Sequence, residues 1–276
     1  MNRCCRLIAC AALVTCLAAA PGAAQEIVKF DTGVGRERIK LGAELHRSRS
    51  EGPSPAAILL HGCGGWQPAV RYTLRSYAED LQKLGFVVLN LDSFGPRFYS
   101  ADEMCASNER LRQALDYRTT DVFDAARFLQ GQSFVDARRV FVVGQSNGGS
   151  VALNVVRAST QDEYVGRRGY PAIRGAVAYY PWCGMLSGKA RLAAPVQVFS
   201  GGKDDWVSAR ECAGVEASGA DYKVTVYADA PHSFDLQIAH QKYAGFSIGN
   251  DPVAAEDSRR RMTAFLSGQA TKDHRR

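Results

Sequence analysis

The residues best suited to chemistry gather around one serine. Ser146 lies in the motif Gly144-Gln145-Ser146-Asn147-Gly148, between an apolar run and a segment with helical spacing. A serine at such a sharp strand-to-helix turn adopts a strained backbone, which lifts its hydroxyl above the edge of a sheet. Glycine is required on both sides because side chains there would collide with the neighbouring strand and helix. The pattern therefore predicts a nucleophilic serine.

A serine hydroxyl needs a general base before it can act as a nucleophile. His232 follows the expected strand Lys223–Tyr227, so it comes out at the same sheet edge as Ser146. We expect His232 to be this base. The other four histidines lie in an early strand, in the glycine-rich loop that follows another strand, in an expected surface helix and in the tail: His46, His61, His240 and His274.

The third group of such a triad is a carboxylate that orients the imidazole and stabilises its cation. It should follow the strand before the histidine, and the segment after Val196–Ser200 contains both Asp204 and Asp205. The pattern Gly-x-Asp-x-x-Val favours Asp204, and Asp205 remains the alternative. The chain order serine, aspartate, histidine is that of the α/β-hydrolases.

Two backbone N–H groups must stabilise the oxyanion of an acyl-transfer reaction. One is expected from Asn147, directly after the nucleophile, where a helix N-terminus offers further N–H groups. The other is expected from Cys63, in the loop His61-Gly62-Cys63-Gly64-Gly65, where glycines let the backbone approach a substrate. We expect His61 to support this loop rather than to act on substrate.

Short apolar runs alternate with segments of helical spacing, which predicts an α/β protein with a mostly parallel central sheet flanked by helices. No internal repeat or low-complexity linker interrupts the pattern, so we expect one domain over residues 25–276. Strands are expected at Glu26–Asp31, Arg38–Arg47, Ala56–His61, Phe86–Leu91, Val140–Val143, Gly175–Tyr180, Val196–Ser200 and Lys223–Tyr227. Helices are expected at Ala69–Leu84, Leu111–Gln130, Asn147–Ala158, Ser208–Ser218 and Pro252–Ser267.

Composition sets the broad class. The 276 residues are 46% hydrophobic and 22% charged, which excludes a disordered, collagenous or coiled-coil chain. The net charge of +6 has no dense focus, so no nucleic-acid partner is expected.

The first 24 residues have the features of a secretory signal peptide. Arg3 and Arg6 precede the apolar run Leu7–Ala20, and small residues follow it. The run is too short to span a bilayer. Cleavage is expected before Gln25, with export to a bacterial periplasm. Acylation of Cys16 is the alternative, although the threonine before it matches a lipoprotein signal poorly.

Export changes the interpretation of the cysteines. Of eight, Cys63, Cys105, Cys183 and Cys212 remain after the signal peptide, an even number in an oxidising compartment. Two disulfides are therefore expected. A metal site is not, because no Cys-x-x-Cys or histidine-rich spacing accompanies these residues.

The chain resembles the dienelactone hydrolase family of α/β-hydrolases over Ala56–Leu266. The resemblance rests on the Gly-x-nucleophile-x-Gly-Gly turn, on Gly-Gly-Lys-Asp204 and on Ala-Pro-His232-Ser-Phe. Exported members of the family share His-Gly-Cys-Gly-Gly and Asp-Ser-Phe-Gly-Pro-Arg. The resemblance implies the α/β-hydrolase fold, whose sheet order makes neighbours of two cysteine pairs, Cys63–Cys105 and Cys183–Cys212.

The sequence departs from the family's namesake enzymes at three points. They use a cysteine nucleophile where this chain has Ser146, and a glutamate in the oxyanion loop where it has Gly62. They bind the substrate carboxylate with two arginines; Arg97 is a candidate for one, and Asp235-Leu236 occupies the region of the other. These differences favour a general serine esterase.

The substrate site is expected to be open, because the fifteen residues 181–195 leave no room for a lid domain. Aromatic residues in loops at the catalytic edge are candidates for its lining: Trp66, Phe94, Trp182, Trp206 and Phe234.

We therefore expect hydrolysis of a carboxylic ester or lactone through an acyl-enzyme, with no metal or organic cofactor. The alternatives are a small serine peptidase or a polyester depolymerase with the same apparatus. A catalytically silent exported binding protein is the rival from another class. The sequence does not specify the acyl group, the alcohol or the oligomeric state.

Overall fold

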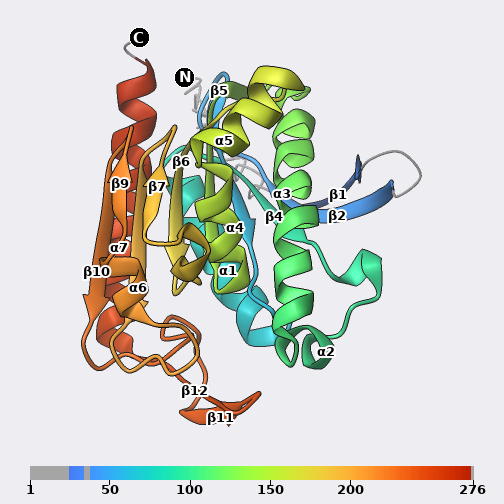
Figure 1. The fold of residues 1–276 in the computed structure, drawn as a ribbon. Helices are drawn as coiled ribbons and strands as arrows, with labels where there is room; N and C mark the ends of the chain where they lie inside the picture. Colours follow the sequence, from blue (N-terminus) through green and yellow to red (C-terminus); the bar gives the residue numbers. More distant parts are fainter. Residues whose placement is uncertain (1–24, 34–37, 275–276) are drawn as a thin grey trace, which may run out of the picture.

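An eight-stranded sheet forms the centre of the protein in the computed structural model, which describes residues 25–33 and 38–274 (Figure 1). Its strand order is β1-β2-β4-β3-β5-β6-β8-β10. The six strands from β4 to β10 are parallel, whereas β1 and β2 form an antiparallel pair and β2 runs antiparallel to β4. The strands are β1 (Gln25–Thr32), β2 (Ile39–His46), β3 (Ser54–Leu60), β4 (Val87–Asp92), β5 (Val135–Gln145), β6 (Ile173–Tyr179), β8 (Val196–Gly201) and β10 (Tyr222–Tyr227).

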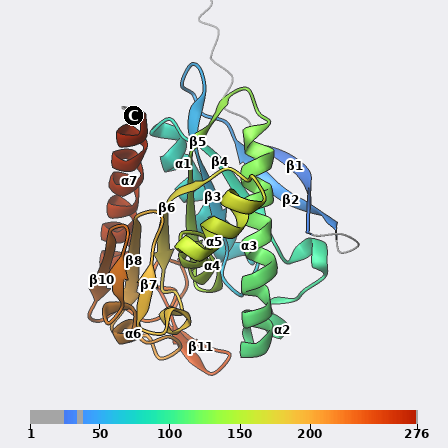
Figure 2. The same cartoon turned by 45° about the horizontal axis from the view of Figure 1, so that its top comes forward.

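Helices cover both faces of this sheet (Figure 2). Buried residues of α3 and α4 pack on one face, and those of α1 and α7 pack on the other. The helices are α1 (Pro68–Lys83), α2 (Ala101–Cys105), α3 (Asn108–Gln130), α4 (Asn147–Val155), α5 (Ala158–Gln161), α6 (Ala209–Ala213) and α7 (Pro252–His274). None of the helices in these ranges is long and apolar enough to cross a membrane.

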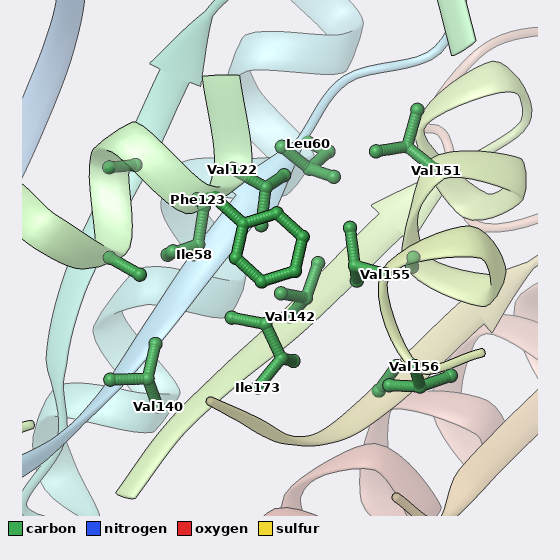
Figure 3. Packing of buried hydrophobic residues seen from close by; sticks show 14 of the residues in the cluster. Ile58, Leu60, Val122, Phe123, Val140, Val142, Val151, Val155, Val156 and Ile173 are labelled. Carbon is green, nitrogen blue, oxygen red and sulfur yellow. The ribbon is translucent and has the colours of Figure 1, made fainter. Parts of the chain in front are cut away.

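The core forms because the central strands are apolar on both faces, as expected for buried parallel strands. Along β3, Ile58 and Leu60 pack toward Val122 and Phe123 of α3 (Figure 3), whereas the alternate residues face α1 and α7. Each such side chain contributes roughly 1.5–3 kcal/mol through its burial. The predicted fold class, an α/β protein with a mostly parallel sheet between helices, is confirmed.

Two predicted elements were wrong. The helix expected over Ser208–Ser218 ends at Ala213, because Gly214 follows it and the chain then extends into β9 (Glu216–Ser218), which pairs with β7 (Lys189–Arg191). His240 does not lie in a surface helix. It occupies a bend, and its Nε2 lies 2.9 Å from the carbonyl oxygen of Asn250.

An antiparallel hairpin that the sequence did not reveal follows this bend. It consists of β11 (Gln241–Tyr243) and β12 (Phe246–Ile248). Between β6 and β8, the short segment 181–195 holds only a 3-10 turn (Cys183–Leu186) and β7, so no lid domain is inserted there.

Both expected disulfides are present. Cys63–Cys105 joins the loop after β3 to α2, and Cys183–Cys212 joins the segment after β6 to α6. Each bond therefore ties together two loop regions at the carboxyl ends of the parallel strands. The region 1–24, where the signal peptide is expected, lies outside the described residues.

The contribution of the disulfides to stability can be tested by removing one of them. Replacing both Cys183 and Cys212 by serine should lower the free energy of unfolding by about 3.5 kcal/mol, because the bond closes a loop of 29 residues in the unfolded chain. Urea unfolding of the variant and of the parent would measure this loss. Free thiols in denatured, unreduced protein that consists of residues 25–276 would contradict the assignment of the bonds.

Candidate active site

The turn that carries Ser146 has the strained backbone that its motif predicts. Ser146 follows β5 and precedes α4 with a φ of 52° and a ψ of −117°. A Cβ atom at Gly148 would lie 2.5 Å from the carbonyl oxygen of His61, and one at Gly144 would overlap the backbone of Gly148. Glycine is thus required on both sides, because β3, β5 and α4 approach each other too closely for any side chain.

A continuous hydrogen-bond chain connects three residues from three different loops. His232 Nε2 lies 3.0 Å from Ser146 Oγ, and His232 Nδ1 lies 2.7 Å from Asp204 Oδ2. The side chains of His232 and Asp204 are 2% and 1% exposed, so water hardly competes for these bonds. Because a carboxylate only accepts hydrogen bonds, the geometry assigns the proton to Nδ1 and leaves Nε2 free to accept from the serine.

The structure distinguishes the two candidate aspartates. Asp204 Oδ1 accepts hydrogen bonds from the backbone N–H groups of Trp206 and Val207, which aims Oδ2 at the histidine. Asp205 faces away. Its carboxylate accepts from Lys242 Nζ at 2.9 Å, and this bond lowers the pKa of Asp205 to about 2. Asp205 also accepts from the backbone of β12, so its role is to hold the β11–β12 hairpin.

A buried carboxylate, that of Asp235, supports His232 indirectly through Tyr180. The ring of Tyr180 lies 4.6 Å from that of His232, and its hydroxyl donates to Asp235 Oδ1 at 2.5 Å. Asp235 also accepts from Tyr77 and from Gln145, the residue before Ser146, both at 2.6 Å. Burial raises the pKa of Asp235. Three donors therefore fix the carboxyl group of Asp235. The sequence indicated this residue only as a departure from the family pattern.

The glycine-rich loop after β3 passes directly beside Ser146. A Cβ atom at Gly62 would lie 3.1 Å from Ser146 Cβ and 3.8 Å from Ser146 Oγ. Cys63 follows and is tied to Cys105 by the disulfide, while Asn147 is the first residue of α4. The backbone segments that carry the two expected oxyanion donors therefore flank Ser146.

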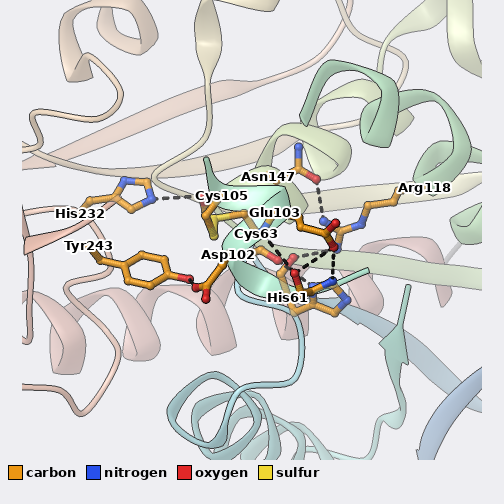
Figure 4. Close-up of a disulfide and its surroundings, with 12 residues drawn as sticks. His61, Cys63, Asp102, Glu103, Cys105, Arg118, Asn147, His232 and Tyr243 are labelled. Carbon is orange, nitrogen blue, oxygen red and sulfur yellow. Dashed lines mark hydrogen bonds between the residues drawn. A yellow bond between two sulfur atoms is a disulfide. The ribbon is translucent and has the colours of Figure 1, made fainter. Parts of the chain in front are cut away.

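Arg118 of α3 joins these two segments, a contact that the sequence analysis missed (Figure 4). Its guanidinium is fully buried and donates to Asn147 Oδ1 and to the carbonyl oxygen of His61, both at 2.7 Å. Burial lowers the pKa of Arg118 to about 10. One signal was available: Arg118 stands on the core-facing stripe of its helix, four residues from both Ala114 and Val122.

His61 is a neutral support for the same loop. Its Nε2 accepts a hydrogen bond from the backbone N–H of Ser93 at 3.1 Å, and its Nδ1 lies 2.7 Å from the carbonyl oxygen of Gly62. Burial holds the pKa of this imidazole well below its ordinary value. The ring therefore fixes the glycine-rich loop next to Ser93.

Two cavities adjoin Ser146, and two of the candidate aromatic residues line them. Trp182 lines one cavity, and Trp206 lines both. Trp206 also lies 5.0 Å, centroid to centroid, from the ring of His232 and stacks on Phe246 of β12. These two tryptophans are the aromatic candidates that share a cavity with Ser146.

The structure places the other candidates elsewhere. Arg97 forms two hydrogen bonds, of 2.8 and 2.9 Å, with the buried carboxylate of Asp121, so it neutralises that charge and does not reach the cavities at Ser146. Phe94 is 1% exposed and packs beneath His61. Trp66 pairs instead with the guanidinium of Arg71. Phe234, equally buried, belongs to the core beneath the histidine loop.

The fold and the geometry around Ser146 define the α/β-hydrolase class. The chain belongs to the dienelactone hydrolase family, whose sequence profile matches residues 41–269. It is therefore a hydrolase, and the resemblance drawn from its motifs is confirmed.

Individual relatives are distant. A Bradyrhizobium protein named "Probable 2-oxo-3-(5-oxofuran-2-ylidene)propanoate lactonase" is 28% identical over 234 residues, which cover 76% of this chain and 86% of the relative. An uncharacterized protein of Mycobacterium tuberculosis is 30% identical over 200 residues, which cover 68% of this chain and 66% of that protein.

Solved structures share the fold at lower identity. The dienelactone hydrolase-like promiscuous phosphotriesterase P91, from metagenomic libraries, has a TM-score of 0.66 and 19% identity over 89% of this chain and 99% of its own. Esterase 2 of Thermogutta terrifontis, in a structure phosphorylated by paraoxon, has a TM-score of 0.62 and 17% identity over 89% and 94%.

The separate roles of the two aspartates predict unequal effects. Asp204→Asn should lower kcat by roughly 10⁴-fold, because an amide favours the wrong imidazole tautomer. Asp205→Asn keeps a side chain that can form hydrogen bonds with the hairpin, and it should lower kcat less than tenfold. Steady-state kinetics of both variants would measure the difference, and equal losses would contradict the assignment.

Substitution of Arg118 is expected to lower turnover through the two segments that this residue joins. Arg118→Met should lower kcat by roughly 10–100-fold with little change in KM, because the two oxyanion segments lose their common donor and small displacements are costly. Thermal unfolding would control for stability. Arg118→Lys, which keeps a buried cation, should recover part of kcat. A rise in KM alone would contradict a positioning role.

Proposed function

We propose that the protein hydrolyses carboxylic esters or lactones through an acyl-enzyme on Ser146. The observation that carries the proposal is the unbroken chain from Asp204 through His232 to Ser146 Oγ, at the end of β5. A serine placed in this way can attack a carbonyl carbon, with the histidine as general base.

The reaction follows from the atoms in place. His232 Nε2 accepts the proton of Ser146 Oγ as the oxygen attacks, and a bond forms between Oγ and the acyl carbon. Collapse of the tetrahedral intermediate breaks the bond to the alcohol oxygen, which takes the proton from His232. Water activated by the same imidazole then releases the acid and restores the serine.

The oxyanion is proposed to bind to the backbone N–H groups of Cys63 and Asn147. Removing one such donor typically costs about 10²–10³ in turnover. Arg118 and the Cys63–Cys105 disulfide support this assignment, because they hold both segments before substrate arrives. Preorganised donors need no rearrangement at the moment of reaction.

Several features favour a general serine esterase over an enzyme that acts on the dienelactone of the family's namesakes. The nucleophile is a serine, Gly62 replaces the glutamate of their oxyanion loop, and Arg97 is committed to Asp121. The names of the similar proteins, a lactonase and an esterase among them, also support acyl-oxygen cleavage. Small serine peptidases and polyester depolymerases remain the alternative activities, and a silent exported binding protein is the rival.

We further propose that residues 1–24 are a signal peptide and that residues 25–276 act as one domain in the periplasm. The two disulfides support this location, since such bonds form in oxidising compartments.

The mature protein should hydrolyse p-nitrophenyl acyl esters, and Ser146→Ala should abolish the activity. Release of p-nitrophenol across a series of acyl lengths measures turnover, and a fluorophosphonate probe should label Ser146. Turnover that survives in Ser146→Ala would contradict the nucleophile. No turnover and no labelling would favour the silent binding protein, whereas amide turnover would favour the peptidase.

A further inference from the structure

The two cavities that meet at Ser146 differ in position and lining. The first, here called the α3 lobe, has a volume of about 230 Å³ and is walled by Leu111, Leu115, Trp182 and Val207. The second, here called the hairpin lobe, has a volume of about 240 Å³. It extends beneath the β11–β12 hairpin and is walled by Leu236, Ile238, Tyr243 and Ile248. Trp206 lines both lobes, as Ser146 does.

The catalytic histidine belongs to one lobe. His232 is among the described residues that line the hairpin lobe, and it is not among those that line the α3 lobe. A general acid must lie within hydrogen-bond reach of the oxygen that it protonates. In ester cleavage that oxygen belongs to the leaving alcohol, so the alcohol must lie on the histidine side of Ser146.

We propose that the hairpin lobe binds the leaving alcohol and that the α3 lobe binds the acyl group. The inference rests on the proposed acyl-enzyme reaction and specifies its substrate as a linear ester. Each half of a linear ester extends away from the scissile bond in its own direction and fills one lobe. A small lactone holds both halves in a single ring, which leaves one of the two lobes empty.

The linings indicate the chemistry of each half. Leucine, valine and tryptophan side chains in the α3 lobe suit an apolar acyl chain, and Arg112, the charged residue there, is already paired with Glu109. Among the described residues of the hairpin lobe there is no Lys, Arg, Asp or Glu. Its polar groups include the neutral side chains of Gln67 and Gln241. An uncharged alcohol therefore fits this lobe.

The β11–β12 hairpin, which lines the hairpin lobe, is anchored at several points. Asp205 accepts hydrogen bonds from Lys242 and from both the backbone N–H and the hydroxyl of Ser247. Tyr243 donates to Asp102 of α2 at 3.2 Å (Figure 4). The alcohol can therefore bind without first ordering a loop.

A pair of matched substitutions tests the assignment, each designed to fill one lobe with an indole. Leu115→Trp should lower kcat/KM for p-nitrophenyl octanoate at least tenfold relative to p-nitrophenyl acetate, with little change across methyl, butyl and benzyl acetates. Ile238→Trp should lower kcat/KM at least tenfold for benzyl acetate relative to methyl acetate, with little change in the ratio between p-nitrophenyl octanoate and p-nitrophenyl acetate. Ile27→Trp, on the exposed edge strand β1, is the matched control and should change neither series.

The two steps of the reaction sharpen the test. The acyl-enzyme no longer contains the alcohol, so Ile238→Trp should change the acylation burst of p-nitrophenol and leave the deacylation rate within twofold. Leu115→Trp should change both. Fluorophosphonate labelling and thermal unfolding would establish that each variant is folded.

Three results would overturn the assignment: reversed effects of the two variants, equal effects of either variant on both series, or faster turnover of γ-butyrolactone than of every linear ester. Failure of the proposed function itself would look different. The parent protein would then show no burst with any ester and no labelling at Ser146.

Discussion

The close approach of three backbones around Ser146 is the constraint on which the rest of the site depends. The end of β5, the start of α4 and the carbonyl end of β3 come together so tightly that glycine is needed at 144 and 148. This contact holds Ser146 at a positive φ that costs free energy, which the surrounding sheet must supply. The apolar faces of the parallel strands are therefore as necessary to the geometry of Ser146 as its own motif.

Around this contact, buried polar groups hold the segments that carry Ser146 and His232. Arg118 joins the two oxyanion segments from one side, and Asp235 collects Tyr77, Tyr180 and Gln145 beneath the histidine from the other. Buried hydrogen bonds of this kind make a site rigid, because the low local dielectric strengthens them. The disulfide to α2 adds a covalent restraint on the same loop.

Short sequence patterns predicted the features that depend on neighbouring residues in the chain. Apolar runs that end in glycines located the sheet strands, and Ser146 and His232 follow from motifs next to strand ends. Long-range pairing escaped prediction. Arg97 looked available for a substrate because its partner Asp121 lies 24 residues away, and Arg118 looked like part of an ordinary helix. The helix expected after Ser208 stopped at Gly214, where a tertiary strand pairing took over.

The position of Trp206 has an optical consequence. Its indole lines both lobes, lies against the His232 ring and stacks on Phe246, and Trp182 borders the α3 lobe. Two of the three tryptophans in the chain thus face the cleft. Emission from an indole depends on the polarity of its surroundings and is quenched by a nearby imidazolium. The protein therefore carries an intrinsic fluorophore that senses both occupancy of the cleft and the charge on its histidine, without any attached dye.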